Sequence, residues 1–397
     1  MSKKIKNNVY SVGKVDWELR RFHGDELSTH HGSTYNSYLI KEQKTVLIDT
    51  VWAPFSAEFM RELPAEVELS RIDAVVINHA EIDHSGAIVD LMQHLPDVPV
   101  YCSHNGVKSL RGHFHKDWNF KPVRTGDRLD IGNGKQLMFI EAPMLHWPDT
   151  MFTYLTQDNI LFSNDAFGQH LATDKIFADL VDQHSLWKEA IKYYANIIAP
   201  WSKLVDSKLR ELKSLDLPID IICPSHGACW RKDIHKIIDA YALWANGYRE
   251  DRITIAYDSM WGATRAMAEA IAKGIREADS EVVLAVHSLA KSDKNDVMTD
   301  IFRSKAFLLG SPSHNKCALA SVGALLEELR GLSFQGKKAA AFGSYGWSGE
   351  GQVRLNSILK EIGYECVDDG IRNMWQPSDA DLARCVEYGR KFALKVQ

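Results

Sequence analysis

The sequence contains no Cys-x-x-Cys pair, although the chain has 397 residues and six cysteines. Without such pairs, neither a disulfide framework nor a thiolate-bound metal is indicated. A rubredoxin-type iron centre is not expected within this chain either, because it needs two such pairs. We interpret the cysteines as ordinary buried thiols. They are Cys102, Cys223, Cys229, Cys317, Cys366 and Cys385.

Long apolar runs and an excess of charge of one sign are also missing. No segment has the roughly 18 consecutive apolar residues of a membrane span, and the start lacks the roughly 7 to 15 apolar residues of a secretory signal. The 47 basic residues nearly balance the 52 acidic ones, which gives a net charge of −5. This balance does not favour a nucleic-acid partner. We therefore expect a cytoplasmic protein that binds neither membranes nor nucleic acids.

The chain length and a change of pattern near residue 250 predict two domains, residues 1–250 and 251–397. Before the polar segment 246–251, short strands alternate with turns and a few helices. The apolar run 72–78 is typical of a buried strand, and the periodicity of 186–198 predicts a helix.

After residue 251, strands alternate with longer helices, which is the pattern of a doubly wound parallel sheet. Five strands in roughly 150 residues fit a flavodoxin-like module. The predicted strands are 253–257, 281–286, 306–310, 339–343 and 364–367.

Four potential metal ligands follow the apolar run 72–78 within six positions: His79, Glu81, Asp83 and His84. In an extended loop, side chains alternate in direction, so His79 and Glu81 can face one point while Asp83 and His84 turn toward a second. Burying such a cluster after a core strand costs free energy unless the side chains bind a ligand such as a metal ion. The segment therefore predicts a site for two metals.

Further candidate ligands follow three other predicted strands, namely His146, Asp165 and His226. Taken singly, a buried histidine is more often a core residue than a ligand, and Asp83 also fits the N-cap of a following helix. Nitrogen and oxygen ligands without thiolates suit iron, manganese or zinc. A carboxylate at Glu81, in addition to Asp83 and Asp165, favours ferric iron among these. Together, four imidazoles and three carboxylates suffice for two metals if one carboxylate bridges them.

Three polar loops follow strands of the second module. A single serine turn before a helix is commonly just a cap. Three loops at the carboxyl ends of strands favour a ligand instead, because hydroxyls and free backbone N–H groups can hold a phosphate and an aromatic side chain can stack on a flavin ring. The loop residues are Ser259, Met260, Trp261, Gly262, Ala263 and Thr264; Ser311, Pro312, Ser313, His314 and Asn315; and Ser344, Tyr345, Gly346, Trp347, Ser348 and Gly349.

The first ligand segment resembles the His-x-His-x-Asp-His motif of the metallo-β-lactamase superfamily, with Glu81 in place of the second histidine. This substitution and the flavin loops resemble the flavodiiron proteins, or A-type flavoproteins, which include the flavorubredoxin core. The resemblance implies an N-terminal metallo-β-lactamase-like αββα sandwich followed by a flavodoxin-like parallel sheet. It also implies FMN and two non-haem irons, bridged by carboxylate and oxo or hydroxo groups, as cofactors.

The resemblance further assigns roles by position. It implies one iron at His79, Glu81 and His146, a second at Asp83, His84 and His226, and Asp165 as the bridge. His314 departs from the small or aliphatic residue that the family often has there. Other residues resemble positions around the irons, and of these we expect His23 and Tyr193 to take part in catalysis. The others are Phe22, Gly24, Trp147 and His170.

The implied function is an oxidoreductase that passes electrons through FMN to the diiron site and reduces NO to N2O, O2 to water, or both. The segments 16–18, 22–24 and 161–170 resemble flavorubredoxin cores, which favours NO. The family implies a head-to-tail homodimer or a homotetramer. Because this chain lacks a rubredoxin-like Cys pattern, we expect a separate rubredoxin, or a flavin- or NADH-linked reductase, as electron donor.

Two other functions remain open at this point. A zinc hydrolase of the β-lactamase or glyoxalase II type, such as a thioesterase, would use a metal-bound hydroxide. Glu81 and the flavodoxin-like module argue against it. An electron carrier or gas sensor would cycle its flavin without consuming gas.

Overall fold

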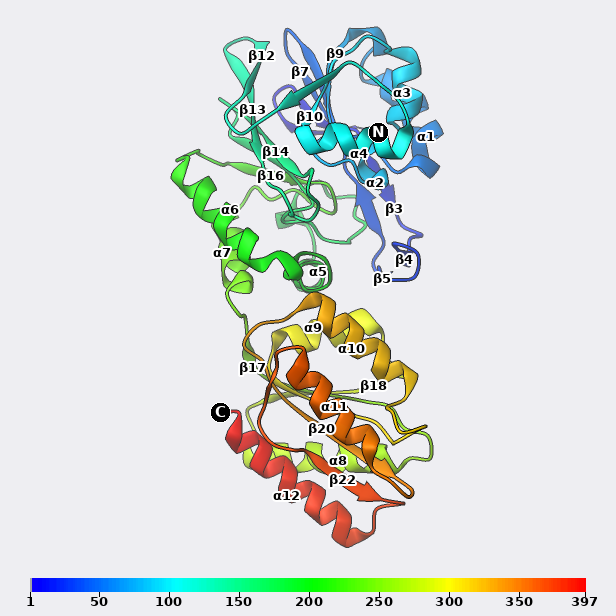
Figure 1. The fold of residues 1–397 in the computed structure, drawn as a ribbon. Helices are drawn as coiled ribbons and strands as arrows, with labels where there is room; N and C mark the ends of the chain where they lie inside the picture. Colours follow the sequence, from blue (N-terminus) through cyan, green and yellow to red (C-terminus); the bar gives the residue numbers. More distant parts are fainter. Residues whose placement is uncertain (1) are drawn as a thin grey trace. The chain divides into compact units, whose positions relative to one another are not determined.

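The computed structural model describes residues 2–397 (Figure 1). By its contacts, the chain forms two units. The first unit comprises the residues up to Tyr193 together with Trp201–Ala242, and the second comprises Tyr194–Pro200 and Leu243–Gln397. The polar segment 246–251, where we place the domain boundary, lies within the second unit.

The first unit contains two large sheets. The seven-stranded sheet has the order β1-β2-β7-β8-β9-β10-β11, and the five-stranded sheet runs from β12 to β16 in chain order. The strands of the first sheet are β1 (Lys3–Lys6), β2 (Val9–Ser11), β7 (Tyr38–Lys41), β8 (Thr45–Ile48), β9 (Ile72–Val76), β10 (Val100–Ser103) and β11 (Phe120–Val123). Those of the second are β12 (Arg128–Gly132), β13 (Lys135–Glu141), β14 (Met151–Leu155), β15 (Ile160–Asn164) and β16 (Ile221–Pro224). Two small ribbons pair β3 (Lys14–Asp16) with β6 (Ser33–Tyr35) and β4 (Arg21–Phe22) with β5 (Leu27–Ser28).

The two sheets share one apolar core. Val46 and Val76 from the first sheet and Phe139 and Phe162 from the second belong to the same buried cluster. Each such side chain contributes about 1.5–3 kcal/mol on burial. Helix α4 contacts β10 and β11, whereas α6 and α7 flank β15 and β16 (Figure 1). The helices of this unit are α1 (Ser56–Glu62), α2 (Ile82–Ser85), α3 (Ile88–His94), α4 (His104–Phe114), α5 (Gln183–Tyr193), α6 (Ser202–Ser214) and α7 (Ile234–Ala245).

The second unit is a parallel sheet with the order β18-β17-β19-β20-β21, and β22 pairs with β20. Helices α8 and α12 pack together and share a core cluster with one face of the sheet, whereas α9 and α10 lie on the other side (Figure 1). The strands are β17 (Glu250–Tyr257), β18 (Val283–Ser288), β19 (Ser304–Gly310), β20 (Lys338–Tyr345), β21 (Glu365–Cys366) and β22 (Ile371–Met374). The helices are α8 (Ala263–Ala278), α9 (Lys294–Arg303), α10 (Ala320–Leu332), α11 (Glu350–Glu361) and α12 (Asp379–Lys395).

The predicted fold class is confirmed in both units, with two local differences. The helix predicted for 186–198 ends at Tyr193, and a π-helical turn, Tyr194–Ile198, continues the chain into the second unit. The strand predicted for 364–367 is only two residues long, because the chain turns at Gly370, with φ of 78°, and forms β22 instead. Glycine adopts this left-handed backbone without the penalty of a Cβ atom.

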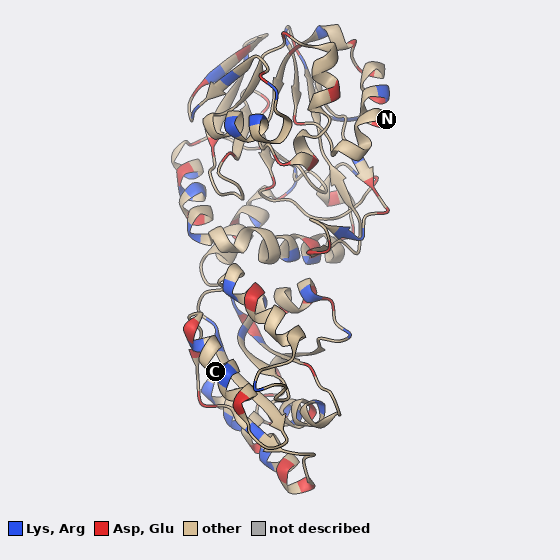
Figure 2. Cartoon of the chain, turned by 45° about the vertical axis from the view of Figure 1, so that its right-hand side comes forward, with Lys and Arg blue, Asp and Glu red and all other residues tan. Residues whose placement is uncertain are grey.

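Charged residues of both signs are distributed over each unit. Lys and Arg lie interspersed with Asp and Glu along both units (Figure 2), in keeping with the small net charge. Among the residues that the structure describes, no helix is both long and apolar enough to cross a membrane.

Lys337, just before β20, is a buried lysine whose amino group contacts backbone carbonyl oxygens. It is 3% exposed, and its Nζ donates to the carbonyl oxygens of Tyr248 and Phe302. Burial, aided by the positive charge of Arg249, lowers the pKa of Lys337 to about 7. Folding therefore favours the neutral amine, which still offers two N–H donors.

We predict that Lys337 makes the second unit more stable as the pH rises from 7 to 9. An unfolded lysine has a pKa of about 10.4, so in this range the unfolded chain holds a proton that the folded chain lacks, and the free energy of unfolding rises by up to about 1.4 kcal/mol per pH unit. Urea unfolding of the wild type and Lys337→Met at both pH values measures this slope. Lys338→Met serves as the control, and an unchanged slope in Lys337→Met would contradict the assignment.

Candidate metal centre

Strand β9 and the turn after it deliver four of the seven predicted ligands. His79 and Glu81 follow the strand, and Asp83 and His84 lie on α2. The second half of the segment, from Ile82, is thus a helical turn and not the extended loop that we expected. Glu81 is the N-cap residue, and its carbonyl oxygen accepts the backbone N–H groups of His84 and Ser85, both at 3.0 Å. Asp83 is therefore not the cap, and its buried side chain is available for another role.

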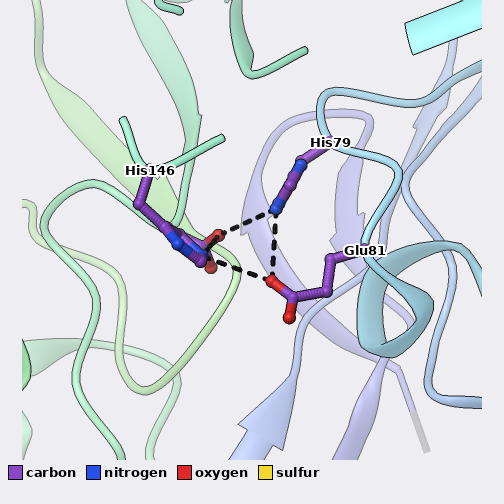
Figure 3. Close-up of side chains that lie close together, drawn as sticks. His79, Glu81 and His146 are labelled. Atoms are coloured by element: carbon purple, nitrogen blue, oxygen red, sulfur yellow. Dashed lines mark hydrogen bonds and ion pairs between the residues drawn. The ribbon is translucent and has the colours of Figure 1, made fainter. Parts of the chain in front are cut away.

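Three of these residues form what we call the first metal group: His79, Glu81 and His146. One carboxylate oxygen of Glu81 faces both imidazoles, and the three side chains converge from two different segments (Figure 3). Its Oε2 is 3.3 Å from Nε2 of His79 and 3.2 Å from Nε2 of His146. With Asp165, their ligand atoms all lie within 4.8 Å of one another. This spacing suits four atoms around one metal ion.

The second metal group consists of Asp83, His84 and His226. Oδ2 of Asp83 is 3.3 Å from Nε2 of His84 and 3.1 Å from Nε2 of His226. Asp165 faces both groups, because its Oδ1 is 3.1 Å from His84 Nε2 and its Oδ2 is 3.3 Å from His146 Nε2. A carboxylate in this position can bridge two ions.

The buried carboxylates show that the residues fit metal ions. Neither oxygen of Asp165, nor Oδ1 of Asp83, makes a hydrogen bond, although both residues are at most 3% exposed. Burial opposes ionisation of Asp165, but the imidazoles of His84 and His146 hold its pKa well below the usual range, so the carboxylate is charged. Buried charges without hydrogen-bond partners are costly unless cations accompany them. Imidazole and carboxylate donors suit iron, manganese or zinc.

Hydrogen bonds from other segments orient the ligand rings. Nδ1 of His79 is 3.1 Å from Oδ2 of Asp149, and Nδ1 of His226 is 2.6 Å from the carbonyl oxygen of Thr34. Such bonds fix the tautomer and direction of a metal-binding imidazole. We did not predict Asp149 or Thr34, because they lie 70 and 192 residues from their partners in the sequence. Only a structure brings them together.

The residues expected to take part in catalysis lie next to the ligands. Nε2 of His23 is 3.1 Å from Oε1 of Glu81, and the His23 side chain is 34% exposed. The ring of Tyr193 is 6.0 Å from that of His226 and 4.9 Å from that of His170. Burial raises the pKa of the Tyr193 phenol well above its usual range. Tyr193 is therefore a neutral hydroxyl beside the second metal group.

The remaining resemblance positions also surround the ligands. Phe22 stacks on His23 with ring centroids 4.5 Å apart, and Trp147 meets His79 edge-on at 5.0 Å. Gly24 has φ of 68°, which turns the chain after His23. The structure thus brings all these residues to one site.

The three predicted flavin loops converge at the carboxyl ends of β17, β19 and β20. Oγ1 of Thr264 lies 2.9 Å from Oγ of Ser344, and the backbone N–H of Ser313 donates to the carbonyl oxygen of Ser344 at 2.8 Å. Helix α8 begins directly after Gly262, so its free N–H groups face this edge. Trp261 and Trp347 are 86% and 84% exposed, which leaves both indoles available to a planar ligand.

A fourth loop at this edge was missed by the sequence analysis. The backbone N–H of Trp375 donates to the carbonyl oxygen of Tyr345 at 2.7 Å, and its indole lies over Gly346, where an added Cβ would be 2.9 Å away. Trp375 is 60% exposed. Trp375 directly follows β22, a strand that we did not predict. Without that strand, nothing in the sequence indicates that Trp375 lies beside the other loops.

Comparison with known proteins gives consistent results for both units. Residues 34–227 match the family model described as ODP family beta lactamase, and residues 255–389 match flavodoxin. The chain is 51% identical to the anaerobic nitric oxide reductase flavorubredoxin of Aeromonas hydrophila, over 99% of this chain and 79% of that protein. It is 50% identical to the protein of the same name from Escherichia coli O1:K1, over 99% of this chain and 82% of that one.

Solved structures agree with these matches. The rubredoxin oxygen:oxidoreductase of Desulfovibrio gigas superposes with a TM-score of 0.96 and 32% identity, covering 100% of this chain and 98% of that one. The flavodiiron protein of Giardia intestinalis gives a TM-score of 0.95 and 32% identity, covering 100% and 97%.

A β-lactamase-like unit with two metal groups, followed in one chain by a flavodoxin unit, defines a flavin- and metal-dependent oxidoreductase. With these relatives, the chain belongs to the flavodiiron protein family. The predicted family, enzyme class and cofactors, FMN and a non-haem diiron centre, are thereby confirmed. The individual ligands and flavin contacts stay predictions.

We predict that Asp165→Ala loses iron but keeps FMN, because it removes the one carboxylate that faces both metal groups. His79→Asn should act in the same direction by removing one ligand of the first group. Iron and flavin contents of the purified variants measure this, with Asp130→Ala, an exposed carboxylate, as control. Retention of both irons in Asp165→Ala would contradict the ligand assignment.

We predict that Gly262→Ala weakens FMN binding about tenfold. Gly262 has φ of 89° at the start of α8, where an alanine is strained by roughly 1–2 kcal/mol. We expect the flavin-free loop of the variant to relax out of this conformation, so that FMN binding has to restore it, and about 1.4 kcal/mol is a tenfold change in affinity. Gly336→Ala is a matched control, because Gly336 has φ of 68° with open space around it and lies just before β20, at the opposite end from the loops. Titration of the flavin-free protein with FMN measures both, and equal affinities would argue against this loop.

Proposed function

We propose that this chain passes electrons from a rubredoxin-type donor or a flavin- or NADH-linked reductase, through FMN, to a diiron site that reduces NO to N2O, O2 to water, or both. The observation that carries the proposal is the pair of metal groups sharing Asp165 in a chain that also has a flavodoxin unit. When bound, the irons supply a reducible site for a gas molecule, and FMN delivers electrons one at a time.

The ligands of the chain set the charge and shape of this site. The first and second metal groups and Asp165 together offer four imidazoles and three carboxylates. Seven protein ligands for two ions leave positions open for a small molecule. Glu81 and His146, whose side chains are both 12% exposed, lie on the accessible side of the cluster, whereas His79 and Asp165 are enclosed.

Protons must reach the site, because both reductions form water. His23 is suited to move them, since its Nε2 touches Glu81 and its side chain is partly exposed. Burial opposes protonation of His23, but the hydrogen bond to Glu81 raises its pKa above the usual value. Tyr193 supplies a neutral hydroxyl beside the second metal group, where it can orient a bound gas molecule.

The proposed assembly and partners follow from the family. The curated relatives that the chain matches are named flavorubredoxins, which supports a rubredoxin, or a flavin- or NADH-linked reductase, as the electron donor. A head-to-tail homodimer, or a homotetramer built from it, would let the FMN of one subunit serve the metal site of another. We place the protein in the cytoplasm.

NO is the favoured gas, because the curated relatives at about 50% identity are named nitric oxide reductases, whereas a structural neighbour at 32% is named an oxygen oxidoreductase. Single-turnover oxidation of the fully reduced, iron-loaded protein tests this choice. We expect NO to oxidise the bound flavin rapidly. If NO leaves the flavin reduced while O2 oxidises it, the protein is an oxygen reductase.

Metal analysis of the anaerobically purified protein, before any iron is added, separates the proposal from a hydrolase. A zinc hydrolase would contain two zincs, no flavin absorption and measurable thioester hydrolysis. A carrier or sensor would show flavin cycling without gas consumption.

A further inference from the structure

The two metal groups offer the same ligand atoms. Each contributes two imidazole Nε2 atoms and one carboxylate, and Asp165 turns one oxygen to each. Judged by these atoms alone, two ions would be bound equally well. Any difference between the two positions must come from the groups behind the ligands.

Behind the first metal group lies a fully buried carboxylate. Oδ2 of Asp149 is 3.1 Å from Nδ1 of His79 and also accepts the backbone N–H of Ala80 at 2.7 Å. Because Nε2 of His79 faces the other ligands, Nδ1 carries the proton and donates it. The carbonyl oxygen of Asp149 accepts from Oγ of Ser103 at 2.7 Å, so the residue is held in place from a third segment.

Behind the second metal group, no carboxylate among the described residues makes a hydrogen bond to Nδ1 of either ligand ring. The buried carboxylate of Asp49 lies near His84, but it accepts its hydrogen bonds from Asn78. Nδ1 of His226 is 2.6 Å from the carbonyl oxygen of Thr34, which is a neutral acceptor. Nδ1 of His84 has no hydrogen-bond partner. Nδ1 of His79 therefore bonds to a carboxylate, whereas Nδ1 of His226 bonds to a neutral carbonyl group and Nδ1 of His84 has no hydrogen-bond partner.

A carboxylate behind an imidazole makes the ring a stronger donor to a metal. In the low-dielectric interior, its charge also stabilises a more highly charged ion more than a less charged one. The first effect acts through His79 and hence on the first group only. The second falls with distance, so it is stronger at the first group, whose ring Asp149 contacts.

We propose that Asp149 makes the two metal positions unequal, so that the ion in the first metal group is held more tightly and is the first to give up an electron. Asp149 is thus a positioning residue that acts through His79. The inference rests on the proposed function of the site as a two-ion redox centre.

Asp149→Asn tests the charge without disturbing the contacts. One oxygen, Oδ2, accepts both hydrogen bonds, and Oδ1 makes none. An asparagine can therefore keep its oxygen in the bonded place and turn its NH2 group to the other side. Asp16→Asn is the matched control: Asp16 is also buried, accepts the backbone N–H groups of Glu18 and Leu19, and contacts no ligand ring.

The first measurement is stepwise Zn²⁺ binding to the full, FMN-loaded chain after removal of metal, in competition with a chelator. We expect two unequal steps in the wild type and in Asp16→Asn. In Asp149→Asn the tighter step should weaken by about 10–100-fold, so that the two steps converge. Equal steps in the wild type, or two unequal steps unchanged in Asp149→Asn, would overturn the inference. A wild type that binds fewer than two ions would instead contradict the proposed function.

The second measurement follows the iron-loaded proteins through a reductive titration by electron paramagnetic resonance. The half-reduced state accumulates to most of the protein only when the first one-electron potential lies well above the second. We expect it to be abundant in the wild type and to decline in Asp149→Asn, because the potential of the first position rises toward that of the second. An undiminished signal would contradict the proposal.

A pair of ligand variants keeps the inference testable if Asp149→Asn does not fold. His226→Ala leaves the first metal group whole, and His146→Ala leaves the second whole. We expect the single Zn²⁺ held by His226→Ala to bind more tightly than that held by His146→Ala. Equal affinities, or the reverse order, would overturn the proposal.

Discussion

The buried carboxylate of Asp165 is the constraint on which the first unit depends. Its two oxygens face imidazoles of both metal groups, and neither makes a hydrogen bond. A buried anion of this kind is tolerated only among cations and polar ligands. Segments that are up to about 150 residues apart in the sequence, from β9 to β16, must therefore end at one point. The shared apolar core of the two sheets holds them there.

The backbone beside the ligands is shaped for this convergence. Asn164, directly before Asp165, has φ of 50°, and Met144, two residues before His146, has φ of 66°. Left-handed backbone at such residues costs roughly 1–2 kcal/mol each. Core side chains such as Phe139 and Phe162, each contributing about 1.5–3 kcal/mol on burial, offset these costs. Local strain at the site is thus sustained by packing between the sheets.

The sequence was sufficient for features that one segment carries by itself. His79, Glu81, Asp83 and His84 stand out because they follow a buried strand, and the strand–helix alternation after residue 251 is a local pattern. The helical turn of α2 was missed, because four polar residues have no apolar periodicity. Asp149 was missed for another reason. A hydrogen bond between residues that are 70 positions apart produces no recognisable pattern in either segment.

The contrast between features of one segment and contacts between distant segments also bears on what distinguishes one redox site from another. The predicted ligands, two imidazoles and a carboxylate for each ion, suit an ion that binds either gas, so the ligand motif, which the sequence reveals, indicates only the class of chemistry. In our proposals, the order in which the ions change charge depends on Asp149 behind His79, and the groups that meet a bound molecule are His23 and Tyr193 beside the ligands. The properties that separate members of one family therefore reside in contacts that only the folded chain creates.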